Sequence, residues 1–162
     1  GLEVFVSTSF SKSFSLYGER VGALSVVCAS KDEAARVLSQ LKIMIRTNYS
    51  NPPIHGASIV ARVLHTPELR ALWEQELAEM RTRIKAMRGK LVQGLKDAGV
   101  EQDMGFITDQ IGMFSYSGLS KEQMVRLRSE FGVYGTDTGR MCVAALNSKN
   151  IDYVCQSIAK VV

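Results

Sequence analysis

The residues best suited to chemistry lie near the start of the chain, where Lys12 follows Ser9 by three positions. This spacing occurs in penicillin-binding enzymes, in which a serine nucleophile works with a nearby lysine. The companion motifs of those enzymes, Ser-Asp-Asn and Lys-Thr-Gly, occur nowhere in the sequence. Ser9 also follows a strand-like run, whereas that nucleophile belongs at the start of a helix. The sequence therefore disfavours a serine nucleophile.

Lys12 is the alternative reactive group, because it stands where a buried strand is predicted to give way to a serine-rich loop. Desolvation favours the uncharged amine that forms an imine with a carbonyl cofactor. Eight residues later, the planar fork of Arg20 suits a phosphate, and the hydroxyls of Ser9 and Ser11 are further donors to it. The structural alternatives are a solvated surface lysine and a surface contact between Arg20 and Glu19.

Two predicted strands flank these residues. The β-forming side chains over residues 3–8 and 22–28 indicate a strand in each segment. Ser30 followed by Glu33 has the spacing of a capping box, in which each side chain satisfies a backbone N–H group of the other residue. This pair predicts a helix over about residues 31–45.

The middle of the chain predicts two more helices. Asn51-Pro52-Pro53 is expected to cap and begin the first, which ends near Leu64. From Pro67 to Ala98, apolar residues recur about every 3.6 positions, which is the helical period. A helix of that length spans about 48 Å, so it would bridge two lobes rather than fit in one core. Its basic residues, interpreted as its solvated face, are Arg81, Arg83, Lys85, Arg88 and Lys90.

The pattern after Gly99 is mixed and predicts an α+β lobe. Strands are predicted at residues 113–117, 133–134 and 141–146. Ser120 with Gln123 predicts a capped helix that stops at Phe131-Gly132. Ser148 is expected to cap the final helix.

Composition excludes several classes of function. The 162 residues are 46% hydrophobic and 22% charged, with a net charge of +4 that calls for neither a nucleic acid nor a membrane partner. The cysteines at positions 28, 142 and 155 lack metal-binding spacing and indicate packed thiols in a cytosolic protein. His55 and His65 are interpreted as ordinary helix residues, so no metal site is expected. The first residues enter a strand without an initiator Met, which predicts a fragment of a longer chain.

Beyond these patterns, the segment around Lys12 is familiar. Residues 9–22, SFSKSFSLYGERVG, closely resemble the cofactor-lysine segment of the aspartate and aromatic amino acid aminotransferases, which are fold-type I enzymes that use pyridoxal 5′-phosphate. The resemblance continues in family order through RTNYSNPP at 46–53, GMFSYSGL at 112–119, FGVY at 131–134 and GRMCVA at 139–144. It covers essentially the whole chain.

The resemblance implies an α/β fold of the fold-type I class. Residues 1–66 would form the C-terminal part of the large domain and its α/β/α sheet. Residues 67–98 would form the long bridging helix, and residues 99–162 the α+β small domain. The family enzymes are homodimers, and a second copy of the chain is therefore the expected partner.

Roles near the cofactor follow from the same resemblance. Lys12 matches the catalytic lysine, which holds the cofactor as an imine and moves a proton once the substrate has displaced it. Arg20 matches the arginine that binds the cofactor phosphate. Ser9 and Ser11 occupy positions on the phosphate side.

Substrate contacts are implied for residues further along the chain. Arg140 matches the arginine that grips the substrate α-carboxylate. Arg46 matches the arginine that reaches from the partner subunit to the distal carboxylate of dicarboxylic substrates, and Ser50 lies where the partner approaches the phosphate. Phe114 corresponds to an aromatic residue near the substrate pocket. Asp137 departs from the family pattern and brings a negative charge close in sequence to Arg140.

The complete enzyme is expected to exchange an amino group between an aromatic or dicarboxylic L-amino acid and a 2-oxo acid such as 2-oxoglutarate, by a ping-pong route in the cytoplasm. Aromatic or broad specificity is favoured, and aspartate aminotransferase proper is the alternative. The family's other cofactor contacts lie upstream of the lysine, so this piece alone is expected to be inactive. A second alternative is a non-catalytic fragment that associates with a partner chain through strand edges and apolar surface left bare by a cut sheet.

Overall fold

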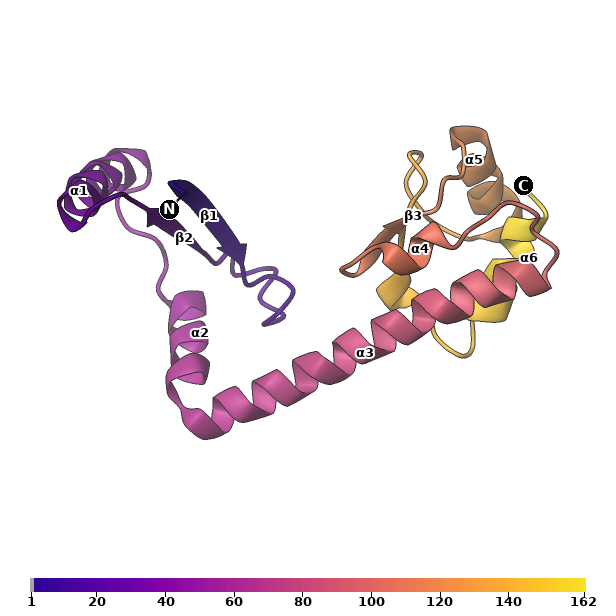
Figure 1. Ribbon diagram of the computed structural model, residues 1–162, viewed down its shortest axis with the longest axis horizontal. Helices are drawn as coiled ribbons and strands as arrows, with labels where there is room; N and C mark the ends of the chain where they lie inside the picture. Colours follow the sequence, from indigo (N-terminus) through magenta and orange to yellow (C-terminus); the bar gives the residue numbers. More distant parts are fainter. Residues whose placement is uncertain (1) are drawn as a thin grey trace. The chain divides into compact units, whose positions relative to one another are not determined.

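An antiparallel hairpin begins the fold (Figure 1). The computed structural model describes residues 2–162 and pairs β1 (Val4–Ser9) with β2 (Gly22–Val27). The register places Ser9 opposite Gly22, so residues 10–21 form the connection between the strands. Gly22 fits this close pairing because a Cβ atom there would lie 2.7 Å from the carbonyl oxygen of Thr8. Both predicted strands are confirmed in position, and each boundary lies within one residue of its prediction. Their expected burial is wrong: every residue of β1 is exposed, and so is every residue of β2 except Val26, because a two-stranded sheet by itself covers little of its surface.

Two helices follow the hairpin, and the prediction of the second began too early. Ser30 caps α1 (Lys31–Asn48) by accepting the Glu33 N–H at 3.2 Å, while the Glu33 carboxylate accepts the N–H of Ala29. The next helix, α2 (His55–His65), was expected to start at the Pro52-Pro53 pair. A residue before proline is pushed into extended backbone, so Pro52 cannot enter a helix and α2 begins two residues beyond Pro53.

The long helix α3 (Pro67–Asp97) is confirmed and ends one residue before its predicted end. Its 31 residues correspond to about 46 Å. The chain divides into two compact units, Gly1–Gln75 and Glu76–Val162, and the boundary falls inside this helix. The predicted division into residues 1–66, 67–98 and 99–162 stays a prediction.

The second unit combines the rest of α3 with a small antiparallel sheet and short helices. Its elements in chain order are α4 (Phe106–Asp109), β3 (Phe114–Tyr116), α5 (Lys121–Phe131), β4 (Arg140–Cys142), the 3-10 turn η1 (Val143–Ala145) and α6 (Ile151–Ala159). Strand β3 pairs with β4 so that Phe114 stands opposite Cys142 and Tyr116 opposite Arg140. The capping box predicted for α5 is present in both directions, between Ser120 and Gln123.

Three details of this unit differ from the sequence predictions. Residues 133–134 form no strand, because Gly132 turns left-handed at the end of α5 and the Val133 N–H returns to Leu127. The strand predicted over 141–146 ends at Cys142 and continues as the 3-10 turn. The last helix is not capped by Ser148. Its N-cap is Asn150, which accepts the N–H of Asn147.

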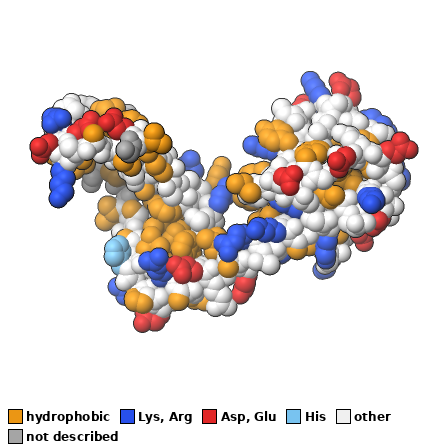
Figure 2. Space-filling view, in the orientation of Figure 1, with side chains coloured by type: hydrophobic (Ala, Val, Ile, Leu, Met, Phe, Trp, Pro, Cys, Tyr) orange, Lys and Arg blue, Asp and Glu red, His pale blue; other side chains and the backbone are white. Residues whose placement is uncertain are grey.

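Burial is uneven between the two units. The core cluster lies in the second unit and is built from side chains of α3, α5, η1 and α6. Its most buried members, at most 1% exposed, include Leu91, Leu95, Met124, Leu127, Val143 and Ile158. In the described part of the first unit, Gly56 and Val60 are the buried residues. Both strands of its hairpin carry exposed apolar side chains, and Phe5 is 75% exposed. Figure 2 shows hydrophobic side chains at the molecular surface. Exposed apolar surface, expected for a cut sheet, is thus present.

The sequence predicted that the basic residues of α3 form its solvated face. The structure shows one exception. Arg88 is only 2% exposed. It lies four residues after Ile84 and three before Leu91, which is the spacing that places a residue on the core face of a helix. The interpretation as a solvated face is therefore wrong for Arg88.

Candidate active site

The connection between β1 and β2 is a fixed structure rather than a loose loop. The N–H of Phe10 donates to the carbonyl of Val21 at 3.2 Å. The indole N–H of Trp73, at the start of α3, donates to the carbonyl of Ser13 at 2.7 Å. The rings of Phe14 and Trp73 stack with their centroids 4.7 Å apart. These contacts hold the lysine-bearing segment against the first turns of α3.

Two cations of this segment contact one aromatic ring. The Nζ atom of Lys12 lies 4.7 Å from the centroid of the Tyr17 ring, and the Cζ atom of Arg20 lies 5.4 Å from it. Arg20 also donates from Nη1 to the carbonyl of Tyr17 at 2.9 Å. Cations are attracted to the faces of aromatic rings at such distances. The structure therefore brings together the lysine and the arginine that the sequence analysis selected, through a tyrosine that it missed.

The backbone around these cations adopts an unusual conformation. Ser15 and Arg20 have φ angles of 56° and 54°, in the left-handed region that few residues other than glycine occupy. Such conformations cost about 1–3 kcal/mol and cluster at functional sites. The turns at Ser15, three residues after Lys12, and at Arg20 itself are thus held by the surrounding structure.

The segment from Ser9 to Arg20 carries several hydrogen-bond donors, among them the hydroxyls of Ser9 and Ser11, the Lys12 amine and the Arg20 guanidinium. Ser9 Oγ accepts the N–H of Ser11 at 3.3 Å, so the two residues are adjacent. Across residues 2–162, neither Lys12 nor Arg20 forms a salt bridge. The alternative, an ion pair between Arg20 and Glu19, is not formed in residues 2–162, and Glu19 lies against Gly56 of α2. Hydroxyl and guanidinium donors suit a phosphate group, and a lysine amine suits condensation with an aldehyde. Lys12 is exposed in this structure, so the desolvation expected from the sequence is not present.

Arg46 and Ser50 meet at the end of α1. Nη1 of Arg46 donates to Ser50 Oγ at 2.7 Å. Ser50 has a φ angle of 66°, and its N–H returns to the carbonyl of Ile45 at 3.0 Å. Both side chains are exposed, so the Arg46 guanidinium keeps donors available for a carboxylate.

In the second unit, the structure brings Arg140 and Phe114 together. The Cζ atom of Arg140 lies 5.0 Å from the centroid of the Phe114 ring, across the β3–β4 pair. Thr136 holds the Arg140 backbone on both sides: its hydroxyl accepts the Arg140 N–H at 3.2 Å, and its own N–H donates to the Arg140 carbonyl at 3.0 Å. An exposed guanidinium on an aromatic ring, with a fixed backbone, is suited to bidentate binding of a carboxylate.

Asp137, whose effect the sequence left open, turns to a different arginine. Its carboxylate accepts from Nη1 of Arg128 at 3.2 Å. In the part of the chain that the structure describes, Arg140 forms no salt bridge. The charge of Asp137 is therefore balanced by Arg128, and Arg140 stays available for a ligand.

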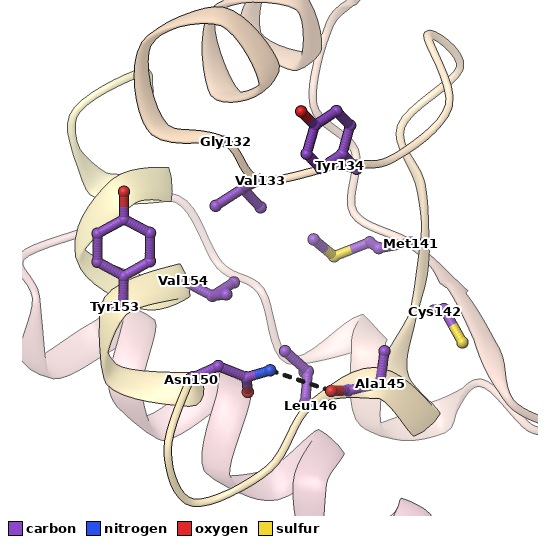
Figure 3. Close-up of a pocket in the computed structure, with 10 residues that line it drawn as sticks. All are labelled: Gly132, Val133, Tyr134, Met141, Cys142, Ala145, Leu146, Asn150, Tyr153 and Val154. Carbon is purple, nitrogen blue, oxygen red and sulfur yellow. Dashed lines mark hydrogen bonds between the residues drawn. The ribbon is translucent and has the colours of Figure 1, made fainter.

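A pocket of about 260 Å³ also lies in the second unit (Figure 3). Met141 points into it and the thiol of Cys142 points away, while the Asn150 side chain donates to the carbonyl of Ala145 at 3.1 Å. Side chains alternate along a strand, so Arg140 lies on the face of β4 opposite Met141. None of the ten residues that line the pocket is a lysine, arginine, aspartate or glutamate. This pocket therefore offers no charged side chain to a carboxylate.

Residues 2–162 contain neither a metal-binding cluster nor a helix that could span a membrane. No group of three or more histidine, cysteine, aspartate or glutamate side chains in that range is placed to bind a metal ion. None of the helices described there has the length and apolar character needed to cross a bilayer.

The chain is similar to known enzymes over almost its full length. It is 62% identical over 161 residues to the aspartate aminotransferase of Pseudomonas aeruginosa, covering 99% of this chain and 40% of that protein. It is 54% identical over 161 residues to the aromatic-amino-acid aminotransferase of Escherichia coli, covering 99% of this chain and 41% of that protein.

Solved structures give the same result. The aromatic-amino-acid aminotransferase of Burkholderia pseudomallei, covalently bound to pyridoxal phosphate, is 69% identical with a TM-score of 0.95, covering 99% of this chain and 40% of that one. The chain thus spans about 40% of the length of these relatives. The family model for aminotransferases of class I and II matches residues 1–158. The chain belongs to the class I and II aminotransferase family.

Proposed function

We propose that this chain is part of a pyridoxal-phosphate-dependent aminotransferase that moves an amino group between an aromatic or dicarboxylic L-amino acid and a 2-oxo acid such as 2-oxoglutarate. One observation carries the proposal. Lys12 and Arg20 share the ring of Tyr17, in the segment that also carries Ser9 and Ser11, and neither cation has a carboxylate partner in residues 2–162. The relatives support it, because they are aspartate and aromatic-amino-acid aminotransferases.

The donor set fits pyridoxal phosphate, which carries an aldehyde and a phosphate group. Lys12 would hold it covalently through Nζ, and Arg20 with Ser9 and Ser11 would bind its phosphate. Ser50 is a further proposed phosphate ligand. When bound, the cofactor supplies an electron-withdrawing ring that stabilises negative charge on the substrate α-carbon. This chemistry explains why an amine and a phosphate site are needed in one segment.

The chain's own residues then divide the work. The Nζ amine of Lys12, once free, accepts the proton of the substrate α-carbon and acts as a general base. Arg140 binds the α-carboxylate through its planar fork, and the ring of Phe114 limits how the guanidinium can turn. Arg46, reaching across to the site of the partner subunit, binds the distal carboxylate of a dicarboxylic substrate there. Together the two arginines fix the substrate and leave the proton transfer to the lysine.

The family resemblance further supports a cytoplasmic homodimer in which Arg46 and Ser50 serve the partner's site. Both side chains are exposed, as this role requires. Specificity for aromatic and dicarboxylic substrates together is our proposal, and preference for aspartate alone is the alternative. Relatives of both kinds match this chain at 54–62% identity.

A second candidate function rests on the exposed apolar surface of the first unit. Phe5 is 75% exposed and Ile43 and Met44 of α1 are 55% and 63% exposed, which suits association with another chain. In this case the chain would be a non-catalytic fragment that binds a partner. Gel filtration of the 17.9 kDa chain separates the candidates: a stable, soluble monomer would argue against the partner-binding fragment.

The test of the main proposal is covalent labelling of the complete protein. Pyridoxal phosphate is added, the imine is reduced with borohydride, and the adduct is located by peptide mass spectrometry. We expect one pyridoxyl group, on Lys12, and none in a Lys12→Arg variant. Lys31→Arg, which removes an exposed lysine at the start of α1, is the control and should keep the adduct. An adduct on another lysine, or no transfer of an amino group from phenylalanine or aspartate to 2-oxoglutarate, would refute the proposal.

A further inference from the structure

Arg88 is a buried charge with an unusual set of partners. It is 2% exposed, yet it forms no salt bridge in residues 2–162. Its guanidinium donates to four uncharged acceptors instead: the carbonyls of Ile107 at 3.0 Å, Gly112 at 2.7 Å and Phe114 at 2.9 Å, and the hydroxyl of Ser115. Helix α3 is thereby joined to the end of α4 and to strand β3.

This arrangement depends on arginine in particular. Burial lowers the pKa of the Arg88 guanidinium below its ordinary value, because desolvation disfavours the charged form. The guanidinium stays protonated in proteins and presents five donors in a planar fork, which suits several acceptors at fixed directions. The ammonium of lysine has three donors and no fork, so it cannot reproduce the same four contacts.

The acceptors lie immediately beside the substrate-binding pair. Nη2 of Arg88 bonds the carbonyls of both Gly112 and Phe114, so it fixes the backbone where β3 begins. Phe114 then presents its ring to Arg140 at 5.0 Å. The next residue, Ser115, is also bound by Arg88 and pairs with Met141, the neighbour of Arg140 on β4. Arg88 therefore holds the strand that carries the ring, from the face on which the Ser115 side chain lies, opposite to that of Phe114.

We propose that Arg88 is a positioning residue for the substrate carboxylate: it fixes β3 so that Phe114 holds the Arg140 guanidinium in its binding orientation. This inference rests on the proposed function, in which Arg140 binds the α-carboxylate. Arg88 touches neither substrate nor cofactor. Its effect reaches the ligand through Phe114 and Arg140.

The test compares two ligands that differ in one group, a carboxylate in the first and a neutral amide in the second. The complete protein, loaded with pyridoxal phosphate, is titrated with 3-phenylpropanoate and with neutral 3-phenylpropanamide by calorimetry. The ratio of the two Kd values measures the carboxylate contact of Arg140. Arg88→Lys should weaken binding of the carboxylate about tenfold, because small misplacement of a binding group is costly. Binding of the amide should stay within about twofold, because it makes no charged contact with Arg140.

A milder variant and a control make the test independent of gross unfolding. Ser115→Ala removes one acceptor of Arg88 and should weaken the carboxylate about threefold while sparing the amide. Ser157→Ala is the matched control, because Ser157 is equally buried but bonds to Tyr153 on its own helix. It should change neither Kd.

The outcomes separate the two proposals. Equal weakening of both ligands by Arg88→Lys and Ser115→Ala, or no effect of either variant, would overturn the positioning role of Arg88 alone. A wild-type protein that binds the amide as tightly as the carboxylate would overturn the role of Arg140, and with it this inference. Selective loss of carboxylate affinity in both variants, with Ser157→Ala unchanged, supports it.

Discussion

Gly94 of α3 faces a side chain of α6 so closely that even a methyl group has no room. A Cβ atom at Gly94 would lie 2.7 Å from Sγ of Cys155 and 3.5 Å from its Cβ. Cys155 is 3% exposed and belongs to the core cluster, so it cannot move aside easily. Gly89 on the same helix has no atom within 4 Å of such a Cβ. The two glycines thus form a matched pair for substitution by alanine.

The magnitude follows from two opposing effects. Replacing glycine by alanine inside a helix stabilises it by about 0.5–1 kcal/mol. Overpacking a filled core costs about 1–3 kcal/mol. Gly89→Ala experiences only the first effect and should raise the free energy of unfolding by about 0.5–1 kcal/mol. Gly94→Ala experiences both and should lower it by about 0.5–2 kcal/mol.

The assay is urea unfolding of the complete protein, followed by circular dichroism. A Cys155→Ala background removes the sulfur atom that the new methyl group would contact. In that background Gly94→Ala should become stabilising, by an amount similar to Gly89→Ala, since only the helix preference remains. If Gly94→Ala raises the urea midpoint in the wild-type background as much as Gly89→Ala does, the packing of α3 against α6 described above is incorrect.

Three further expectations concern single groups. Burial, and then the nearby Asp152 and Asp97, raise the pKa of Cys155 to about 11. At pH 8 about one molecule in a thousand therefore carries this thiolate, against roughly one in four for an ordinary cysteine. Iodoacetamide should therefore modify Cys155 at least 100-fold more slowly than the cysteines of the unfolded chain. The rate of modification should rise tenfold per pH unit up to about pH 11, and mass spectrometry at successive times measures it. Ser120→Ala removes the capping box of α5 and should cost about 1 kcal/mol in urea unfolding; an unchanged midpoint would contradict the importance of this cap. Asp137→Asn should leave the KM for phenylalanine within about twofold, because an exposed carboxylate already paired with arginine contributes little, and a larger change would mean that Asp137 acts on Arg140.

Elements governed by local patterns were predictable from the sequence. The 3.6-residue period located α3 to within one residue of each end, and the Ser120 capping box located the start of α5. Residues 133–134 were wrongly predicted to form a strand because their side chains favour β-structure. In fact the left-handed turn at Gly132 ends α5, and the Val133 N–H bonds back to Leu127 of that helix. Local preference is overridden where a neighbouring cap determines the path of the chain.

The sequence pointed to the residues of the candidate site but not to their contacts, and the roles of these residues stay predictions. The spacing of Lys12 and Arg20 was visible in the sequence, yet their meeting on Tyr17 requires the left-handed backbone at Ser15 and Arg20. No spacing rule for regular elements describes such a loop. Arg88 was missed because basic residues on helices are usually solvated. Its position between Ile84 and Leu91 on the apolar face was the available signal.

The uneven burial of the two units has a consequence for amide hydrogen exchange. Backbone amides are protected to the extent that opening them exposes packed surface. In the chain taken by itself, α3 crosses from a unit with few buried side chains into one with a filled core. Its amides before Gln75 should therefore exchange with deuterium sooner than those around Leu91 and Leu95, although all belong to one continuous helix. Protection would then follow the packing on each turn rather than the secondary structure.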